Sequence, residues 1–251
     1  MADRPKWLIL GENLFNPIVA ANLLATRSLT FGNPQVEPLP YMAVCHFVGC
    51  LETSIEANKQ GKHSVAVCLV RQCLEALTII DVGLQKPAYA EPLLLAWSEG
   101  KKTAGQLRQN LEHDIWPHYG KGLWTESWAE FFGNLAQSVH PYAHYSPELQ
   151  GWQWATITSR ETGALMAIGP DTYDELRAAR ITLLHILLIW ASGRIILAYD
   201  GKLLDNTHQE QMAELGAAIA SSNLLFEKQN WGVQLVPHLV FKAGYDWRKQ
   251  A

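Results

Sequence analysis

The spacing of apolar residues predicts a chain built mainly from helices. Over residues 41–60, apolar side chains from Val44 to Ile55 recur at intervals of three and four, which is typical of an amphipathic helix. Residues 63–84 are apolar almost all round and predict a core helix. Only two or three residues around Gly61 separate the two segments, so we expect an antiparallel helical hairpin that turns at this glycine.

The same periodicity predicts five further helices, over residues 88–97, 103–116, 125–139, 172–199 and 206–228. Thr103 and Thr125 are the expected N-caps of two of them, and Ser64 that of the core helix, because their hydroxyls accept hydrogen bonds from first-turn N–H groups. His140 is expected at the end of its helix, since it precedes Pro141 and such residues disfavour the helical conformation.

Residues 151–169 show a different period. Trp152, Trp154, Thr156 and Thr158 alternate with their neighbours, which predicts a β-hairpin. The tail, residues 231–251, fits either an extended segment or a short strand. No linker divides the chain, so we expect one all-α domain, residues 1–251, formed as an up-and-down helical bundle with a small inserted hairpin and C-terminal helices at 172–228.

Composition excludes several classes of protein. The 251 residues are 48% apolar and only 18% charged, against about 25% charged in a typical soluble domain. Abundant apolar material and a formal charge of −4 exclude a disordered chain. Because Asp and Glu (24) outnumber Lys and Arg (20), a basic nucleic-acid coat is excluded as well.

Tryptophan is abundant, with ten residues, and six lie in the middle of the sequence: Trp97, Trp116, Trp124, Trp128, Trp152 and Trp154. Tryptophan is favoured at protein–protein interfaces, but it also fills large cores. Both interpretations stay open, and the first predicts a homo-oligomer or a protein partner.

Two features favour a cytoplasmic protein without a membrane span. The four cysteines lie in helical, apolar sequence and read as reduced core thiols (Cys45, Cys50, Cys68 and Cys73). The apolar run Trp7–Leu10 is too short for a signal peptide. Residues 181–199 are apolar enough to raise the question of a membrane helix, but His185 and Arg194 interrupt them, so we predict a buried core helix.

Arg71 and Glu75 form the first candidate site. A spacing of four puts them on one face of an otherwise apolar helix. Two opposite charges in such a run must pair, or one must reach another partner. The pair is either a structural ion pair or part of a pocket in which Arg71 holds a phosphate or carboxylate.

The second candidate is the segment around His140, with Tyr142, His144 and Tyr145 close behind it. This density of histidine and tyrosine suits a general acid or base, or a ligand cradle, whereas His140 could equally cap the carbonyls of its helix. Pro141 disrupts the helical spacing that two histidines need to share a metal, so we expect no metal and no cofactor.

The third candidate is an Arg-x4-His pattern, which occurs twice. Arg108 and His113 lie in the more polar of the two segments and are the better pair; the other is Arg180 with His185. Lys101 and Lys102 precede the first pair and complete the main basic cluster, a possible contact for an anionic substrate.

Together these motifs resemble bacterial helical proteins of the HEPN superfamily. The resemblance covers residues 41–145 and rests on Arg71-x-x-x-Glu75 in a core helix and on Ser138-x-His140-Pro141 at the end of a later one. It implies an up-and-down helical bundle, usually dimeric. Many relatives are metal-independent endoribonucleases of toxin–antitoxin or phage-defence systems, in which the arginine of an Arg-x4–6-His motif stabilises a phosphate and the histidine transfers protons.

Two functions follow from these observations. The first is a HEPN-like protein that acts on RNA, with Arg71, Glu75, His140, Arg108 and His113 around a cleft, and with substrate contacts from Tyr142, His144, Tyr145, Lys101 and Lys102. The second is a non-catalytic helical binding protein or assembly subunit with a tryptophan-rich interface.

Overall fold

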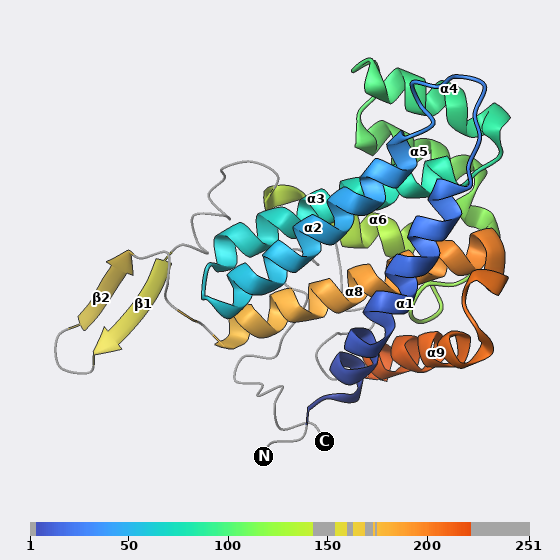
Figure 1. Cartoon of the computed structure of the whole chain (residues 1–251). Helices are drawn as coiled ribbons and strands as arrows, with labels where there is room; N and C mark the ends of the chain where they lie inside the picture. The colour runs from blue at the N-terminus through green and yellow to red at the C-terminus, as the bar shows by residue number, and fades with distance from the viewer. Residues whose placement is uncertain (1–3, 143–153, 160–162, 169–172, 174, 222–251) are drawn as a thin grey trace.

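The computed structural model describes residues 4–142, 154–159, 163–168, 173 and 175–221, and these residues confirm the all-α class (Figure 1). Within the described ranges the chain forms eight α-helices: α1 Lys6–Arg27, α2 Leu39–Lys59, α3 His63–Gly83, α4 Pro87–Ser98, α5 Ala104–Asp114, α6 Trp128–Val139, α8 Glu175–Asp200 and α9 Asn206–Ser221. Three short 3-10 helices join them: η1 Trp116–His118, η2 His140–Tyr142 and η3 Gly201–Leu203.

Helix α1 lies ahead of the first predicted element. Gly11, Pro17 and Asn22 interrupt its apolar pattern, yet two of them face the core. A Cβ at Gly11 would lie 2.5 Å from Cδ1 of Ile186, so the glycine lets α1 approach α8 closely. Asn22 is buried and donates hydrogen bonds to Ile18 O and to Ser192 Oγ of α8. These apparent breaks in the pattern are therefore helix–helix contacts.

Helices α2 and α3 form the expected hairpin, with Gly61 at φ 79° after the last turn of α2. Of the three expected N-caps, one is confirmed and two are wrong. Thr103 caps α5 through a full capping box with Gln106, as predicted. The cap predicted at Ser64 is wrong, because α3 begins at His63 without a side-chain cap.

The cap predicted at Thr125 is also wrong, since Ser127 caps α6 two residues later. The residues before it form a loop around Glu126, whose buried carboxylate accepts hydrogen bonds from the backbone N–H groups of Leu123 and Trp124. This local alternative to helical hydrogen bonding delays the start of the helix.

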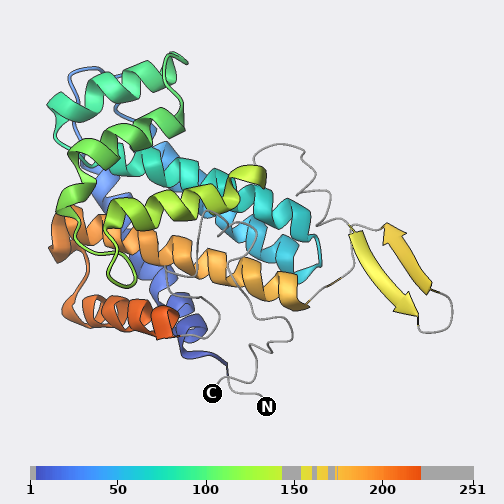
Figure 2. The same cartoon turned by 180° about the vertical axis from the view of Figure 1, so that it is seen from behind.

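Helix α3 is central to the packing. It contacts α2 and α8 along its length and α4, α5 and α6 on other sides, and Figure 2 shows α6 (yellow-green) lying beside it. Helix α1 packs across α8, α9 and α2. Fifteen of the twenty-one residues of α3 are buried, which agrees with its prediction as a core helix.

Two helices in the described part of the chain, Lys6–Arg27 and Arg177–Leu203, have the length and apolar composition of a membrane span. In the second of these, 78% of the most apolar window is buried inside the protein, against 44% in the first. The burial of residues 181–196 agrees with the predicted core helix.

The tryptophans largely serve the core where their side chains are described. Trp116 and Trp128 are fully buried and pack their rings against Phe132 at centroid distances of 4.8 and 5.8 Å. Trp97 and Trp124 are partly buried against the same core. Two of the six tryptophans considered for an interface are therefore committed to the interior.

Residues 154–159 (β1, Trp154–Ser159) and 163–168 (β2, Gly163–Ile168) pair as antiparallel strands, at the place where the alternating pattern predicts a hairpin. Trp154 is opposite Ile168 and Ser159 is opposite Gly163 in the register. The remaining residues of the predicted hairpin, the tail at 231–251 and the predicted helical residues 222–228 lie outside the described residues.

Candidate functional site

Three of the charged residues selected from the sequence lie together between α3 and α5. Arg71 is only 7% exposed, and its Nη2 lies 2.6 Å from Oε1 of Glu75, one turn further along α3. Arg108 comes from α5 and is partly buried. We call these three residues the arginine cluster.

The two guanidinium groups of the arginine cluster are close enough to influence each other. The pKa of Arg108 is lowered, first by burial and then by the positive charge of Arg71, while Glu75 acts in the opposite direction. Two positive charges therefore share one carboxylate in a partly desolvated environment. Among the described residues, one positive charge of the cluster therefore has no carboxylate partner.

Hydrogen bonding in the cluster is also incomplete. Three buried guanidinium nitrogens, Arg71 Nε, Arg71 Nη1 and Arg108 Nη1, have no hydrogen-bond partner among the described residues. A buried donor without an acceptor costs about 1–3 kcal/mol, and more when it is charged. Most buried polar groups in folded proteins have a hydrogen-bond partner, so three unsatisfied donors in one cluster call for an explanation.

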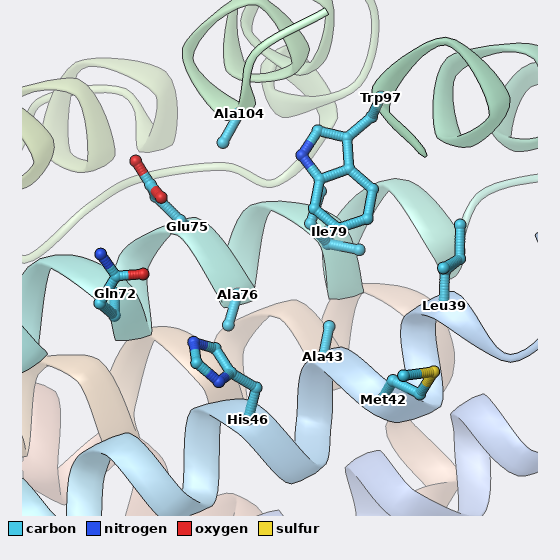
Figure 3. Close-up of a pocket in the computed structure, with 10 residues that line it drawn as sticks. All are labelled: Leu39, Met42, Ala43, His46, Gln72, Glu75, Ala76, Ile79, Trp97 and Ala104. Carbon is cyan, nitrogen blue, oxygen red and sulfur yellow. The ribbon is translucent and has the colours of Figure 1, made fainter. Parts of the chain in front are cut away.

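A pocket of about 320 Å³ adjoins the cluster at Glu75 (Figure 3). It lies between α2, α3, α4 and the start of α5. In Figure 3 the Glu75 carboxylate points towards Ala104 of α5, while the Trp97 indole reaches down from α4 over Ile79. Most of the lining is apolar: Leu39, Met42, Ala43, Ala76, Ile79, Trp97 and Ala104.

Two polar side chains complete the pocket wall. The His46 ring lies across from Gln72 and next to Ala76 (Figure 3). His46 Nε2 is 3.5 Å from Sγ of Cys50, one turn along α2. An apolar cavity with a few polar groups, next to a charged cluster at one end, is the usual form of a site for a small organic molecule.

The other residues of the Arg108 segment do not join the cluster. His113 is five positions after Arg108, which places it about 140° round the helix, and its side chain is 88% exposed. It pairs with Asp114, whose carboxylate raises the histidine pKa through a hydrogen bond. Lys101 is exposed and pairs with Glu99, and Lys102 donates to Asn110.

The His140 segment is only partly described. His140 follows the last residue of α6, as predicted, but its ring is exposed and makes no hydrogen bond within the described residues, so it does not cap the helix carbonyls with its side chain. Tyr142 is buried at 3% exposure and so is not a surface contact. His144 and Tyr145 lie outside the described residues.

The second Arg-x4-His pair is divided between two environments. His185 is buried on α8, and its Nε2 lies 2.7 Å from Oγ of Ser54 on α2. Burial lowers the pKa of His185 to about 3, so the ring is neutral at ordinary pH. Arg180 is only partly buried, five positions away on the same helix.

A second buried charge lies further along α3. Asp81 is completely buried, and its carboxylate accepts hydrogen bonds from Trp116 Nε1 (2.7 Å), the Tyr119 hydroxyl (2.6 Å) and Gln85 Nε2 (3.1 Å). Burial raises the pKa of Asp81 to about 6, and these three donors oppose the shift. Asp81 thus ties the end of α3 to the segment around η1.

The described residues contain no group of three or more His, Cys, Asp or Glu side chains that could hold a metal ion. The cysteines are free thiols. Cys50 and Cys73 are buried and Cys68 is half-buried, but Cys45 is exposed, so its prediction as a core thiol is wrong. Burial raises the pKa of the Cys50 thiol and keeps it protonated.

Asp81 and His46 belong to none of the candidate sites expected from the sequence, and Trp97 was considered only for a protein interface. Asp81 interrupts an apolar run in the same way as Arg71, and that pattern could have identified it. His46 and Trp97 line the pocket from α2 and α4, and their side chains meet only through the packing of the helices. No local pattern marks them.

Comparisons with known proteins give no relative for this chain. No family model matches it, and neither the curated proteins nor the solved structures contain a significant match.

Proposed function

We propose that this protein binds a small organic acid, a carboxylate or a phosphate ester, with its anionic group at the arginine cluster and its apolar part in the adjoining pocket. It follows the pocket interpretation of Arg71 and Glu75, in which Arg71 holds a phosphate or carboxylate, rather than the tryptophan-rich protein interface that the sequence also allows. The observation that carries the proposal is the uncompensated charge of the cluster together with three buried guanidinium nitrogens that have no partner in the described part of the chain.

The chemistry of the pocket supports this class of ligand. A guanidinium group presents a planar set of N–H donors that matches a carboxylate or phosphate. The pocket volume of about 320 Å³ lies in the range of small-molecule sites. Its apolar walls, with the Trp97 indole above Ile79, suit a flat or aliphatic body better than a polar one (Figure 3).

The Glu75 side chain is the part of the cluster that can move. It is 38% exposed and lines the pocket, whereas the Arg71 side chain is 9% exposed behind it. Movement of the Glu75 side chain would open the way from the pocket to the guanidinium nitrogens that have no partner among the described residues. An incoming anion would accept hydrogen bonds from these nitrogens and balance the remaining positive charge, so no unpaired charge is left buried.

Calorimetric titration of the full chain with 2-naphthoate tests the proposal, with the uncharged 2-methoxynaphthalene as comparison. We expect saturable binding of the acid that weakens by about tenfold or more in Arg71→Met and in Arg108→Met, since each variant removes charge-assisted hydrogen bonds. Lys101→Met is the matched control, because Lys101 is exposed and outside the cluster, and it should bind normally. Equal affinity in all four proteins would contradict the proposal.

Metal-independent cleavage of RNA by a HEPN-like up-and-down bundle is the second candidate. It is supported by the proximity of Arg71, Glu75 and Arg108, three of the five residues expected around its cleft. A phosphodiester also carries a single negative charge. We favour binding of a small acid for two reasons. The guanidinium nitrogens without a partner among the described residues are buried, where an RNA backbone does not reach. His113 and His140 are exposed, so neither ring is buried beside these nitrogens to transfer a proton.

Incubation of total RNA with the full chain in the presence of a chelator tests this candidate. Fragments that appear with the wild type and disappear with Arg71→Met and His140→Ala would support it and displace the binding proposal. RNA that stays intact under conditions in which 2-naphthoate binds would exclude it.

A further inference from the structure

A second cavity, of about 320 Å³, lies between α1, α2 and α8, away from the arginine cluster. Its walls are mainly apolar, with contributions from all three helices: Leu8, Phe15, Ile55, Ala178, Ile186 and Ile189. Glu12 and Lys59 belong to the lining but are exposed to solvent, so they mark its mouth. The other polar lining residues are uncharged: Asn58, Thr182 and His185 lie inside, and Tyr173, which is 51% exposed, lies at the edge.

Two of these polar groups are already satisfied by the protein. Asn58 donates to Ala178 O at 2.9 Å and to Thr182 Oγ1 at 3.2 Å, and its Oδ1 lies 2.9 Å from Nδ1 of His63. The Thr182 hydroxyl donates to Ala178 O at 2.7 Å. Neither side chain needs a ligand to complete its hydrogen bonds.

His185 differs from them. Its side chain is 3% exposed and lines the cavity, and its Nε2 contacts Ser54 Oγ. The other ring nitrogen, Nδ1, makes no hydrogen bond to any described residue. A buried histidine whose second ring nitrogen has no partner among the described residues can form a specific hydrogen bond to a ligand in an apolar cavity.

The hydrogen-bond direction identifies what this nitrogen can recognise. The Ser54 hydroxyl has one proton, which it donates to Ala66 O at 2.8 Å. Ser54 must then accept the hydrogen bond from His185, so Nε2 carries the proton of the neutral ring. Nδ1 is therefore an acceptor, and its partner must be a donor.

We propose that this cavity binds an uncharged, mostly apolar molecule that carries a hydroxyl group, such as a phenol or an apolar alcohol, and that the hydroxyl donates to Nδ1 of His185. The proposal does not depend on the acid-binding site. A ligand with a negative charge would find no cation inside the cavity, because the pKa of His185 is about 3 and the ring stays neutral.

Titration of the full chain with three matched compounds tests the proposal: 2-naphthol as donor, 2-methoxynaphthalene without a donor and 2-acetylnaphthalene as acceptor. We expect 2-naphthol to bind about tenfold more tightly than either comparison compound, because only it pairs with Nδ1. Its affinity should be constant from pH 5.5 to 8, unlike a contact with a histidine that titrates in that range.

Two variants locate the site. Ile55→Phe places a larger side chain in the cavity and should abolish binding of 2-naphthol, while Val65→Phe adds the same ring at a position that is 49% exposed and should not. His185→Phe should remove the preference for 2-naphthol. If His185→Phe does not fold, the three compounds still decide on the wild type: equal affinities, a preference for the acceptor, or binding unaffected by Ile55→Phe would overturn the proposal.

Discussion

Helix α3 carries two buried charges whose surroundings differ. Around Asp81, the carboxylate accepts three hydrogen bonds, and the donors come from the end of α3 and the segment around η1. Around Arg71, one nitrogen pairs with Glu75 and two have no partner among the described residues. Asp81 has the hydrogen bonding of a structural residue, whereas the Arg71 nitrogens without a partner among the described residues are the basis of the proposed anion site.

The largest effect that this comparison predicts is in Asp81→Ala. The variant leaves the Trp116 indole N–H and the Tyr119 hydroxyl buried without their acceptor, which should reduce the free energy of unfolding by about 3 kcal/mol or more. Urea unfolding followed by circular dichroism at pH 7 measures it. Asp114→Ala is the control, because Asp114 is exposed and should change the midpoint little. A loss below about 1 kcal/mol in Asp81→Ala would mean that the network is not structural.

The pH dependence of stability gives the next largest effect. The pKa of Asp81 is about 6 in the folded protein, above its ordinary value of 3.8. A raised carboxyl pKa contributes stability that is fully present below pH 3.8 and is lost as the pH rises through 6. Wild-type stability, measured relative to Asp81→Asn, should therefore fall by roughly 2 kcal/mol between pH 4 and pH 7.

The wild type is compared with Asp81→Asn because His185 changes the stability with pH in the opposite direction. Its pKa of about 3 lies below the ordinary value of 6.5, so its contribution is present above pH 6.5 and is lost as the pH falls towards 3. The contribution of His185 to the free energy of unfolding is the same in both proteins and cancels in the difference. A difference that stays constant with pH would show that Asp81 has an ordinary pKa.

The same contrast explains what the sequence could and could not reveal. A charge in an apolar helical run is visible in the sequence, so Arg71 and Glu75 were selected correctly as a pair on one helix face. The approach of Arg108 depends on how α5 packs against α3. Because helix crossing depends on side-chain packing along both surfaces, no local pattern predicts it.

Some helices and helix ends can likewise be predicted from local chemistry, and others cannot. The cap at Thr103 and the end of α6 at His140 follow from local chemistry and were predictable. Helix α1 was not predictable, because Gly11 and Asn22 weaken its apolar pattern. These two residues stabilise the fold only through their contacts with α8. The absence of His113 from the cluster was predictable too, because five residues turn a helix through about 140° from Arg108. The exposure of the His140 ring depends on tertiary packing.

A smaller effect is expected for Tyr119→Phe. The variant removes one of three donors to Asp81 and leaves the ring in place, so the free energy of unfolding at pH 7 should fall by about 1–2 kcal/mol. The pKa of Asp81 should rise further, because a hydrogen bond that favours its charged form is lost. Tyr41→Phe, at a position that is 39% exposed, is the control. If both variants unfold at the same urea concentration, the Tyr119 hydroxyl contributes nothing.

The smallest effect on stability is expected for Arg71→Met, although Arg71 is almost as deeply buried as Asp81. Methionine fills a similar volume and removes both the unpaired nitrogens and the desolvated charge, so the free energy of unfolding should change by less than about 1 kcal/mol and can increase. Glu75 is 38% exposed and can be solvated once its partner is lost. The variant should nevertheless lose binding of 2-naphthoate. Stability that is kept while binding is lost separates a ligand site from a structural ion pair, whereas a loss as large as that of Asp81→Ala would place Arg71 in the same structural class as Asp81.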